Sequence, residues 1–251
     1  MLKYLHAEIY KAAHRKYPYG FLLAMFLCEG LLVAGWVFTN ANGNNIGFDT
    51  GARMIAMLLQ VGLYSTILIG DIVFSEQYKF NTLKNEVSYG VPRSRIYLGK
   101  LAVECLVALV LCAVVIAFYL GMCWVFLPHD PATDGQILQE VGYCLLVSLP
   151  LWLGAQALVN LVFFLIKSST VGSFVVVGIF MGVPPILKLL GMLVHPIFTT
   201  IYSGLLTTPF EQTASALNDW AFFGRACAIG AGWFVACTLI GLVLFRNKEI
   251  N

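Results

Sequence analysis

The sequence predicts an all-α membrane protein with six transmembrane helices, forming a single domain over residues 1–251. The chain is 59% hydrophobic and only 11% charged, whereas an average soluble domain is about 45–50% apolar and about 25% charged. Its mean hydropathy is +0.83. Its apolar runs are long and continuous, unlike the alternating segments of about ten residues in barrel strands. Helices are therefore required to satisfy the backbone hydrogen bonds in lipid.

Six segments contain the roughly 20 apolar residues that a membrane span needs. They cover residues 19–38, 53–74, 96–127, 141–166, 171–194 and 220–245. The third is longer than a bilayer requires, so we expect it to begin as an extension outside the hydrocarbon. The outer loops are short and predict no folded extracellular domain, and the inner loops are short except for residues 75–95.

The distribution of basic residues predicts the topology. Twelve of the 15 Lys and Arg fall in the N-terminal tail, between spans two and three, in the turn KSST, or after span six. The opposite loops hold none, although Arg53, Lys188 and Arg225 lie near that side. Because cytoplasmic loops carry an excess of Lys and Arg, we expect a multi-pass protein of the plasma membrane with both termini in the cytoplasm.

Residues 1–18 predict an amphipathic helix that lies at the membrane interface. One face carries apolar residues: Leu2, Leu5, Ile9, Ala12 and Ala13. The other face is basic: Lys3, Lys11, His14 and Arg15. Such a helix is attracted to anionic lipid on the cytoplasmic side. The alternative is an ordinary basic tail ahead of the first span.

The fifth span is interrupted by GVPPILK. Pro184 and Pro185 lack amide hydrogens, so the helix is expected to kink or stop there. The following residues 195–210 are apolar but broken by Gly and Pro. Two interpretations are open: a re-entrant segment on the outer side, or a surface loop after a kinked span.

No catalytic residues and no metal site are predicted. The sequence has no GxxxxGK[ST] phosphate loop, no HExxH and no CxxC pair. All seven cysteines lie in or beside apolar runs, as small packing residues do. The sequence therefore favours a protein that is not an enzyme and that carries no cofactor of its own.

Three acidic residues within the spans are candidate functional groups, because charge in the membrane is expensive. Glu29 is expected near the middle of the bilayer, and Asp71 and Glu104 closer to the cytoplasmic surface. Glu29 could be a polar contact in a substrate path or could lock two helices together. The alternative for Glu29 is a carboxyl packed between helices. Asp71 and Glu104 could instead reach the interface or pair with a basic residue.

Between spans two and three, residues 76–87 predict a short amphipathic helix. Phe80, Leu83 and Val87 recur at helical spacing, with charged residues around them: Glu76, Lys79, Lys84 and Glu86. Gly90 suits a helix stop and Pro92 a helix start. Because so short a helix is unstable alone, it must dock on lipid or on a protein.

This segment, NTLKNEVSYGVPRSRIYLGK with the preceding Glu76, resembles the corresponding segment of ABC-transporter permeases of the type-2 (exporter) class. The matching residues are Glu76, Asn81, Thr82, Leu83, Lys84, Ser88, Arg95 and Lys100. The outline of the chain is also similar, with a basic N-terminal helix, six spans and an interrupted outer segment. Its size and short outer loops are most similar to permeases that export antimicrobial peptides or confer lantibiotic immunity in Gram-positive bacteria.

The resemblance implies a permease subunit that exports a hydrophobic or amphipathic substrate, such as an antimicrobial peptide or drug. ATP and Mg²⁺ would bind a separate ATP-binding subunit, and a second permease, identical or homologous, would complete the assembly. Residues 76–87 would form the coupling helix that docks on the ATP-binding subunit. The implied partner-binding residues are Glu76, Lys79, Phe80, Asn81, Thr82, Leu83, Lys84, Val87, Arg93 and Arg95.

Two other functions are open from the residues alone. A secondary transporter or channel would call for matched broken helices, and only one break is visible. A scaffold or sensor subunit would recruit a cytoplasmic partner without transport. Nothing in the sequence indicates nucleic acid as a partner.

Overall fold

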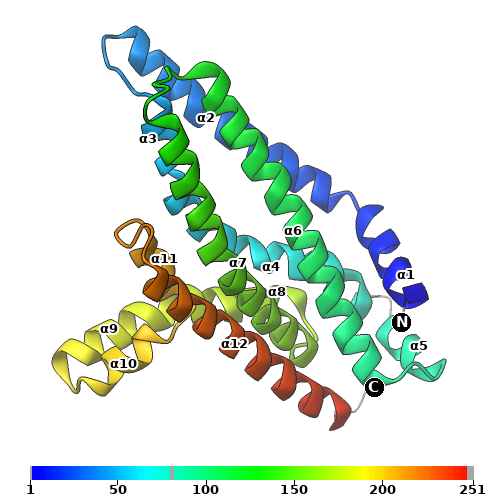
Figure 1. The fold of residues 1–251 in the computed structure, drawn as a ribbon. Coiled ribbons are helices and arrows are strands. Elements are labelled where there is room, and N and C mark those ends of the chain that lie inside the picture. Colours follow the sequence, from blue (N-terminus) through cyan, green and yellow to red (C-terminus); the bar gives the residue numbers. More distant parts are fainter. Residues whose placement is uncertain (1, 80–81, 248–251) are drawn as a thin grey trace.

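The computed structural model describes the backbone of residues 2–79 and 82–247, and the side chains of residues 4–74 and 82–246. Over these residues the chain is helical, with no strand (Figure 1). In chain order the elements are α1 (Leu2–Ala13), α2 (Tyr17–Ala41), α3 (Phe48–Arg53), α4 (Ile55–Lys79), α5 (Thr82–Ser88), α6 (Arg93–Phe126), α7 (Asp134–Leu165), α8 (Ser169–Val177), the π-helical turn η1 (Gly178–Gly182), α9 (Val183–Leu193), α10 (Ile197–Ser203), α11 (Thr207–Thr213) and α12 (Trp220–Asn247).

Six helical segments among the described residues are long and apolar enough to cross a membrane, which confirms the predicted number of spans. The second span begins at Phe48, five residues before the predicted start, because α3 precedes α4 with only Met54 between them. Helix α6 has 34 residues. At about 1.5 Å per residue it exceeds the roughly 30 Å hydrocarbon core of a bilayer.

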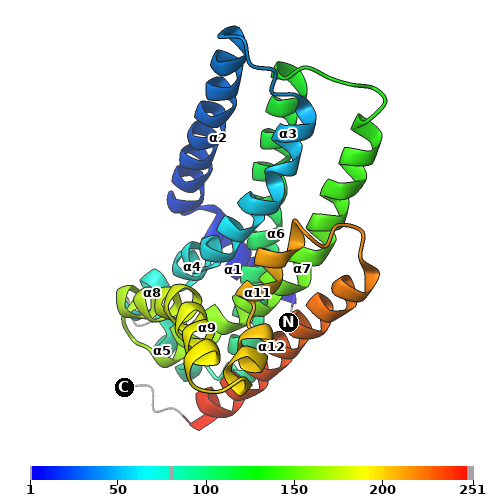
Figure 2. The same ribbon diagram turned by 90° about the vertical axis from the view of Figure 1, so that its left-hand side faces the viewer.

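Helix α7 lies at the centre of the bundle. It packs against α3, α4, α6, α8 and α12, and its residues Ala155, Val159 and Phe163 are fully buried. Helix α2 lies at the edge and packs mainly on α6 (Figure 2). Many of its apolar side chains, such as Leu31, are exposed, as expected for a lipid-facing helix.

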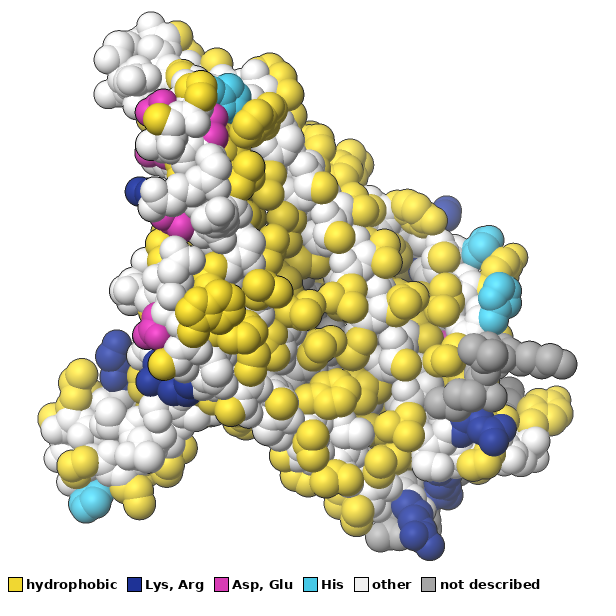
Figure 3. Space-filling model, viewed as in Figure 1, with side chains coloured by type: hydrophobic (Ala, Val, Ile, Leu, Met, Phe, Trp, Pro, Cys, Tyr) yellow, Lys and Arg dark blue, Asp and Glu magenta, His cyan; other side chains and the backbone are white. Residues whose placement is uncertain are grey.

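The start of α1 and the end of α12 lie at one end of the bundle, here called the terminal end (Figure 1). Helices α1 and α5, the start of α6 and the end of α12 meet there. The opposite end holds the loops after α2 and α6, joined by a hydrogen bond from the Phe48 N–H to the Pro128 carbonyl (2.9 Å). Figure 3 shows apolar side chains over much of the surface between these ends, with Lys and Arg near the end of α12 and also beside α9 and α11.

The fifth span is helical from Ser169 to Leu193 and does not stop at Pro184 or Pro185. Its irregular part is a π-helical turn at Gly178–Gly182, ahead of the two prolines. Pro184 and Pro185 follow in the first turn of α9, where a missing amide hydrogen costs little. Helix α10 then packs back on α9, and α11 contacts α4 and α7. Residues 195–210 are thus largely helical. Their re-entry into the bilayer stays a prediction.

The predicted helix over Glu76–Val87 has the wrong boundaries. Helix α4 continues to Lys79, and the separate helix α5 begins only at Thr82. Residues 71–89 contain no Gly or Pro that would stop α4 earlier. The predicted turn is confirmed: Gly90 has φ +80°, its N–H bonds to the Val87 carbonyl, and Pro92 precedes α6.

Candidate functional site

A buried ionic cluster joins α1, α5 and α6 at the terminal end. The Lys100 ammonium on α6 lies 2.8 Å from Glu8 Oε2 on α1 and 4.0 Å from Glu86 Oε1 on α5. Lys11 on α1 lies 2.5 Å from the other Glu8 oxygen and 3.5 Å from Glu86 Oε1. The Tyr4 hydroxyl donates to Glu86 Oε2 at 3.0 Å. Two acids and two bases thus connect three helices.

Burial makes this cluster strong and costly to break. The Lys100 side chain is 0% exposed and that of Glu8 4% exposed. Burial alone would raise the pKa of Glu8, but Lys100 and Lys11 outweigh it and hold that pKa below the ordinary value. Burial would lower the pKa of Lys11, but Glu8 and Glu86 keep it above the ordinary value. Both groups are therefore charged at neutral pH.

Helix α1 also fits α6 by shape. A Cβ added at Gly99 would lie 2.5 Å from Tyr4 Cε1, so the Tyr4 ring occupies the space above this glycine. Leu5 and Ile9 pack on the core and Ala12 is buried. Ala13, predicted on the same apolar face, is exposed and ends the helix, which stops short of the predicted residue 18.

The attachment of α1 is expected to weaken at both extremes of pH. The contribution of Glu8 is present above its ordinary pKa of 4.5 and is lost as the pH falls through its lowered pKa. The contribution of Lys11 is present below its ordinary pKa of 10.5 and is lost as the pH rises through its raised pKa. Hydrogen exchange of the α1 amides, corrected for the intrinsic pH dependence of exchange, measures this. The variant Glu8→Gln should remove the acid transition, and an unchanged transition in that variant would exclude Glu8 as its source.

The described residues of the predicted coupling helix divide into an inner and an outer face. Leu83 is buried and Val87 packs on the core, whereas Lys84 is exposed. Thr82 lines a cleft of about 700 Å³ with basic residues of α1 and the linker after it. The side chains of Glu76, Lys79, Phe80 and Asn81 lie outside the described residues.

The two predicted arginines after the turn have different surroundings. Arg93 donates from Nη1 to the carbonyls of Phe245 and Arg246, at 3.1 and 2.7 Å, and so ties the start of α6 to the end of α12. Arg95 is exposed. Among the predicted partner-binding residues whose side chains the structure describes, Lys84 and Arg95 are the exposed charged ones.

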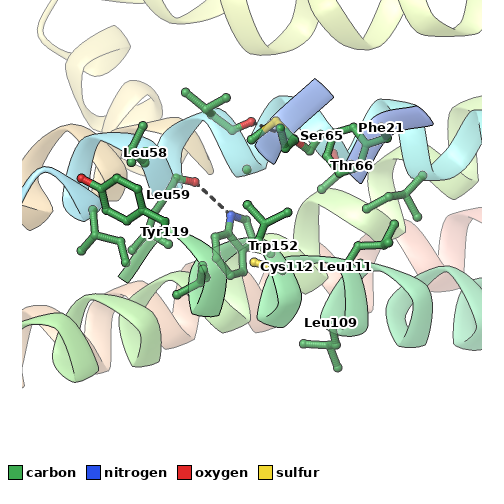
Figure 4. A pocket seen from close by; sticks show the side chains of 18 of the residues that line it. Phe21, Leu58, Leu59, Ser65, Thr66, Leu109, Leu111, Cys112, Tyr119 and Trp152 are labelled. Atoms are coloured by element: carbon green, nitrogen blue, oxygen red, sulfur yellow. Dashed lines mark hydrogen bonds between the residues drawn. The ribbon is translucent and has the colours of Figure 1, made fainter. Parts of the chain in front are cut away.

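The second candidate region is a cavity of about 410 Å³ among α2, α4, α6 and α7. Its walls are mostly apolar, as Figure 4 shows for Leu58, Leu111 and the Trp152 ring. Glu29, the central residue of α2, lines this cavity and is 6% exposed. Its Oε2 atom has no hydrogen-bond partner among the described residues.

The other two acidic candidates do not line this cavity. Glu104 is fully buried and accepts a 3.0 Å hydrogen bond from Gln156 Nε2. This hydrogen bond joins α6 to α7. Asp71 on α4 accepts a hydrogen bond from Ser169 at the start of α8. The structure thus does not bring Glu29, Asp71 and Glu104 together into one site.

Residues 4–185, more than half of the chain, match the family described as ABC-2 family transporter protein. The chain belongs to this family. No curated protein matches the chain. Membership of the ABC-2 family makes the chain the membrane component of a transporter and not its ATPase. It also confirms the resemblance to type-2 exporter permeases drawn from residues 76–100.

The sequence reasoning missed the role of Glu8 in this ABC-2 permease. A signal was present, because Glu8 lies between Leu5, Ile9 and Ala12 on the apolar face of α1. A carboxylate on a buried face needs a cationic partner. That partner, Lys100, lies 92 residues away in the sequence, so the pairing required the fold.

Proposed function

We propose that this chain is the permease subunit of an exporter for hydrophobic or amphipathic substrates, powered by a separate ATP-binding subunit. The ABC-2 family gives the general role of a transporter permease. The finer proposal is supported by one observation: α5 is attached on its inner face to α1 and α6 and exposes Lys84 on its outer face.

The contacts of α5 suit a transmitting element. Leu83 anchors it in the core, and Glu86 links it to Lys11 of α1 and Lys100 of α6. A force on the outer face of α5 would therefore reach the base of the α6 span. A seven-residue helix held only by lipid would lack this connection.

Charge reversal on the outer face, Lys84→Glu, is expected to weaken docking of the ATP-binding subunit. Lys84 is exposed and makes no buried contact that folding needs, so the loss should be specific to binding. A rim charge of this kind changes affinity roughly tenfold. The measurement is co-purification of a P-loop ATPase with tagged permease, identified by mass spectrometry, together with the ATPase activity of the complex.

Lys188→Glu is the matched control, because Lys188 is an exposed lysine on α9, far from α5. It should leave co-purification unchanged. Equal retention of the ATPase by both variants would contradict docking at α5. Absence of any P-loop ATPase from the wild-type preparation would favour the alternatives, a secondary transporter or channel, or a scaffold.

We further propose that the terminal end faces the cytoplasm of a plasma membrane and that two permeases pair. The basic residues beside both termini support this orientation by the positive-inside rule. Antimicrobial peptides or drugs remain the proposed cargo, supported by the apolar cavity that opens among the spans.

A further inference from the structure

The cavity among α2, α4, α6 and α7 has an unusual polar lining, because its polar side chains offer acceptors and few free donors. The hydroxyl and indole donors that line it are already used within the protein. Ser65, Thr66, Tyr119 and Trp152 donate to the backbone carbonyls of Val61, Leu63, Gly51 and Leu59, respectively. Figure 4 shows the last of these bonds.

Glu29 and Gln156 both line this cavity. One oxygen of each side chain, Glu29 Oε2 and Gln156 Oε1, is buried and has no hydrogen-bond donor among the described residues. The amide nitrogen of Gln156 donates to Glu104. The side-chain carbonyl oxygen of Gln156 is therefore the atom that lacks a partner. A buried acceptor without a donor costs free energy, and a carboxylate costs most. Both groups therefore call for a ligand that donates hydrogen bonds.

We infer that this cavity binds a lipophilic primary ammonium, with the Glu29 carboxylate as its counter-charge. An ammonium group supplies three donors and no acceptor. Its apolar chain would lie against the aliphatic and aromatic walls formed by residues such as Leu59, Leu111 and Trp152. This inference rests on the proposed export function and assigns the chemical class of its substrate.

The geometry disfavours other occupants. A phosphate or carboxylate headgroup would bring further acceptors to a wall that offers few donors. The cavity volume of about 410 Å³ falls within the roughly 300–1,000 Å³ of small-molecule sites.

Binding of tritiated dodecylamine to the full chain in lipid nanodiscs tests this inference, with empty nanodiscs as background. Glu29→Gln keeps the size of the side chain and removes its charge. Because a hydrogen bond to a charged group is lost, the affinity for dodecylamine should fall at least about tenfold. Unlabelled dodecanol should compete at least about tenfold more weakly than dodecylamine against the wild type, and equally against Glu29→Gln.

Glu104→Gln is the matched control, a second buried carboxyl that lies outside the cavity lining and can still accept from Gln156. It should bind dodecylamine like the wild type. Ala108→Phe places a bulky ring in the cavity and leaves Glu29 in place, so it should weaken binding. This second variant keeps the test decisive should Glu29→Gln fail to fold.

Equal affinity of wild type and Glu29→Gln, or unaltered binding by Ala108→Phe, would overturn the inference. The test is separate from that of the proposed function, because it needs no ATP-binding subunit. Lys84→Glu should leave dodecylamine binding unchanged, and Glu29→Gln should leave co-purification of the ATPase unchanged. Failure of one assay therefore does not imply failure of the other.

Discussion

Replacing Glu8 by leucine is expected to destabilise the permease by about 3 kcal/mol, which is the lower end of the range for breaking a buried ion pair. The variant leaves the fully buried Lys100 ammonium without its partner at 2.8 Å. Glu86 at 4.0 Å and the Phe74 ring at 6.0 Å give partial compensation. The measurement is equilibrium unfolding in mixed micelles, followed by circular dichroism.

The double variant Glu8→Leu, Lys100→Met separates this effect from simple loss of contact. Replacing both charges by apolar groups of similar volume removes the unpaired charge, so stability should return to within about 1 kcal/mol of the wild type. Lys11→Met is the control. Its side chain is 51% exposed, so it should cost less than about 1 kcal/mol. Equal losses in the single and double variants would show that the unpaired charge is not the cause.

Gly230→Ala is expected to destabilise the crossing of α7 and α12, also by about 3 kcal/mol, near the upper end of the cost of overpacking. An added Cβ would overlap the carbonyl group of Pro150 and lie 2.8 Å from the Leu151 nitrogen. Both are backbone atoms of α7, so the two helices would have to separate. Close backbone approach at small residues is a common basis of helix packing in membranes.

Gly232→Ala is the matched control on the same helix, because no heavy atom lies within 4 Å of its added Cβ. Alanine is the better helix former, so this variant should be neutral or more stable by about 0.5–1 kcal/mol. Thermal unfolding in nanodiscs compares the two. A similar midpoint for both variants would mean that α7 and α12 can separate at little cost.

Long elements were predictable from the sequence because each span satisfies its own backbone in lipid and so depends little on its neighbours. The missing amide hydrogen of Pro184 predicted an irregularity in the fifth span, but not its position in the π-helical turn at Gly178–Gly182. The limits of α4 and α5 could not be predicted, because residues 71–89 contain no residue that stops a helix and the apolar period runs on from one helix to the next.

Single residues of the site could be predicted from the sequence, but the contacts between them could not. Glu29 could be placed near the middle of a span by counting residues, and the structure finds it at the centre of α2. The salt bridge of Glu8 and the bond of Glu104 to Gln156 join residues 92 and 52 positions apart. A pairing across such distances follows from how helices cross, which hydropathy and periodicity do not specify.

The π-helical turn at Gly178–Gly182 has a mechanical consequence for the hairpin of α9 and α10 beyond it. A π turn holds one residue more than the α-helical turn it replaces, and one residue corresponds to about 100° of rotation in an α-helix. Conversion of this turn to regular α-helix would rotate α9 about its own axis by about that angle. Such a rotation would change the orientation of the α9–α10 hairpin. It would replace the i→i+5 hydrogen bonds of the π turn by i→i+4 bonds and leave the span helical.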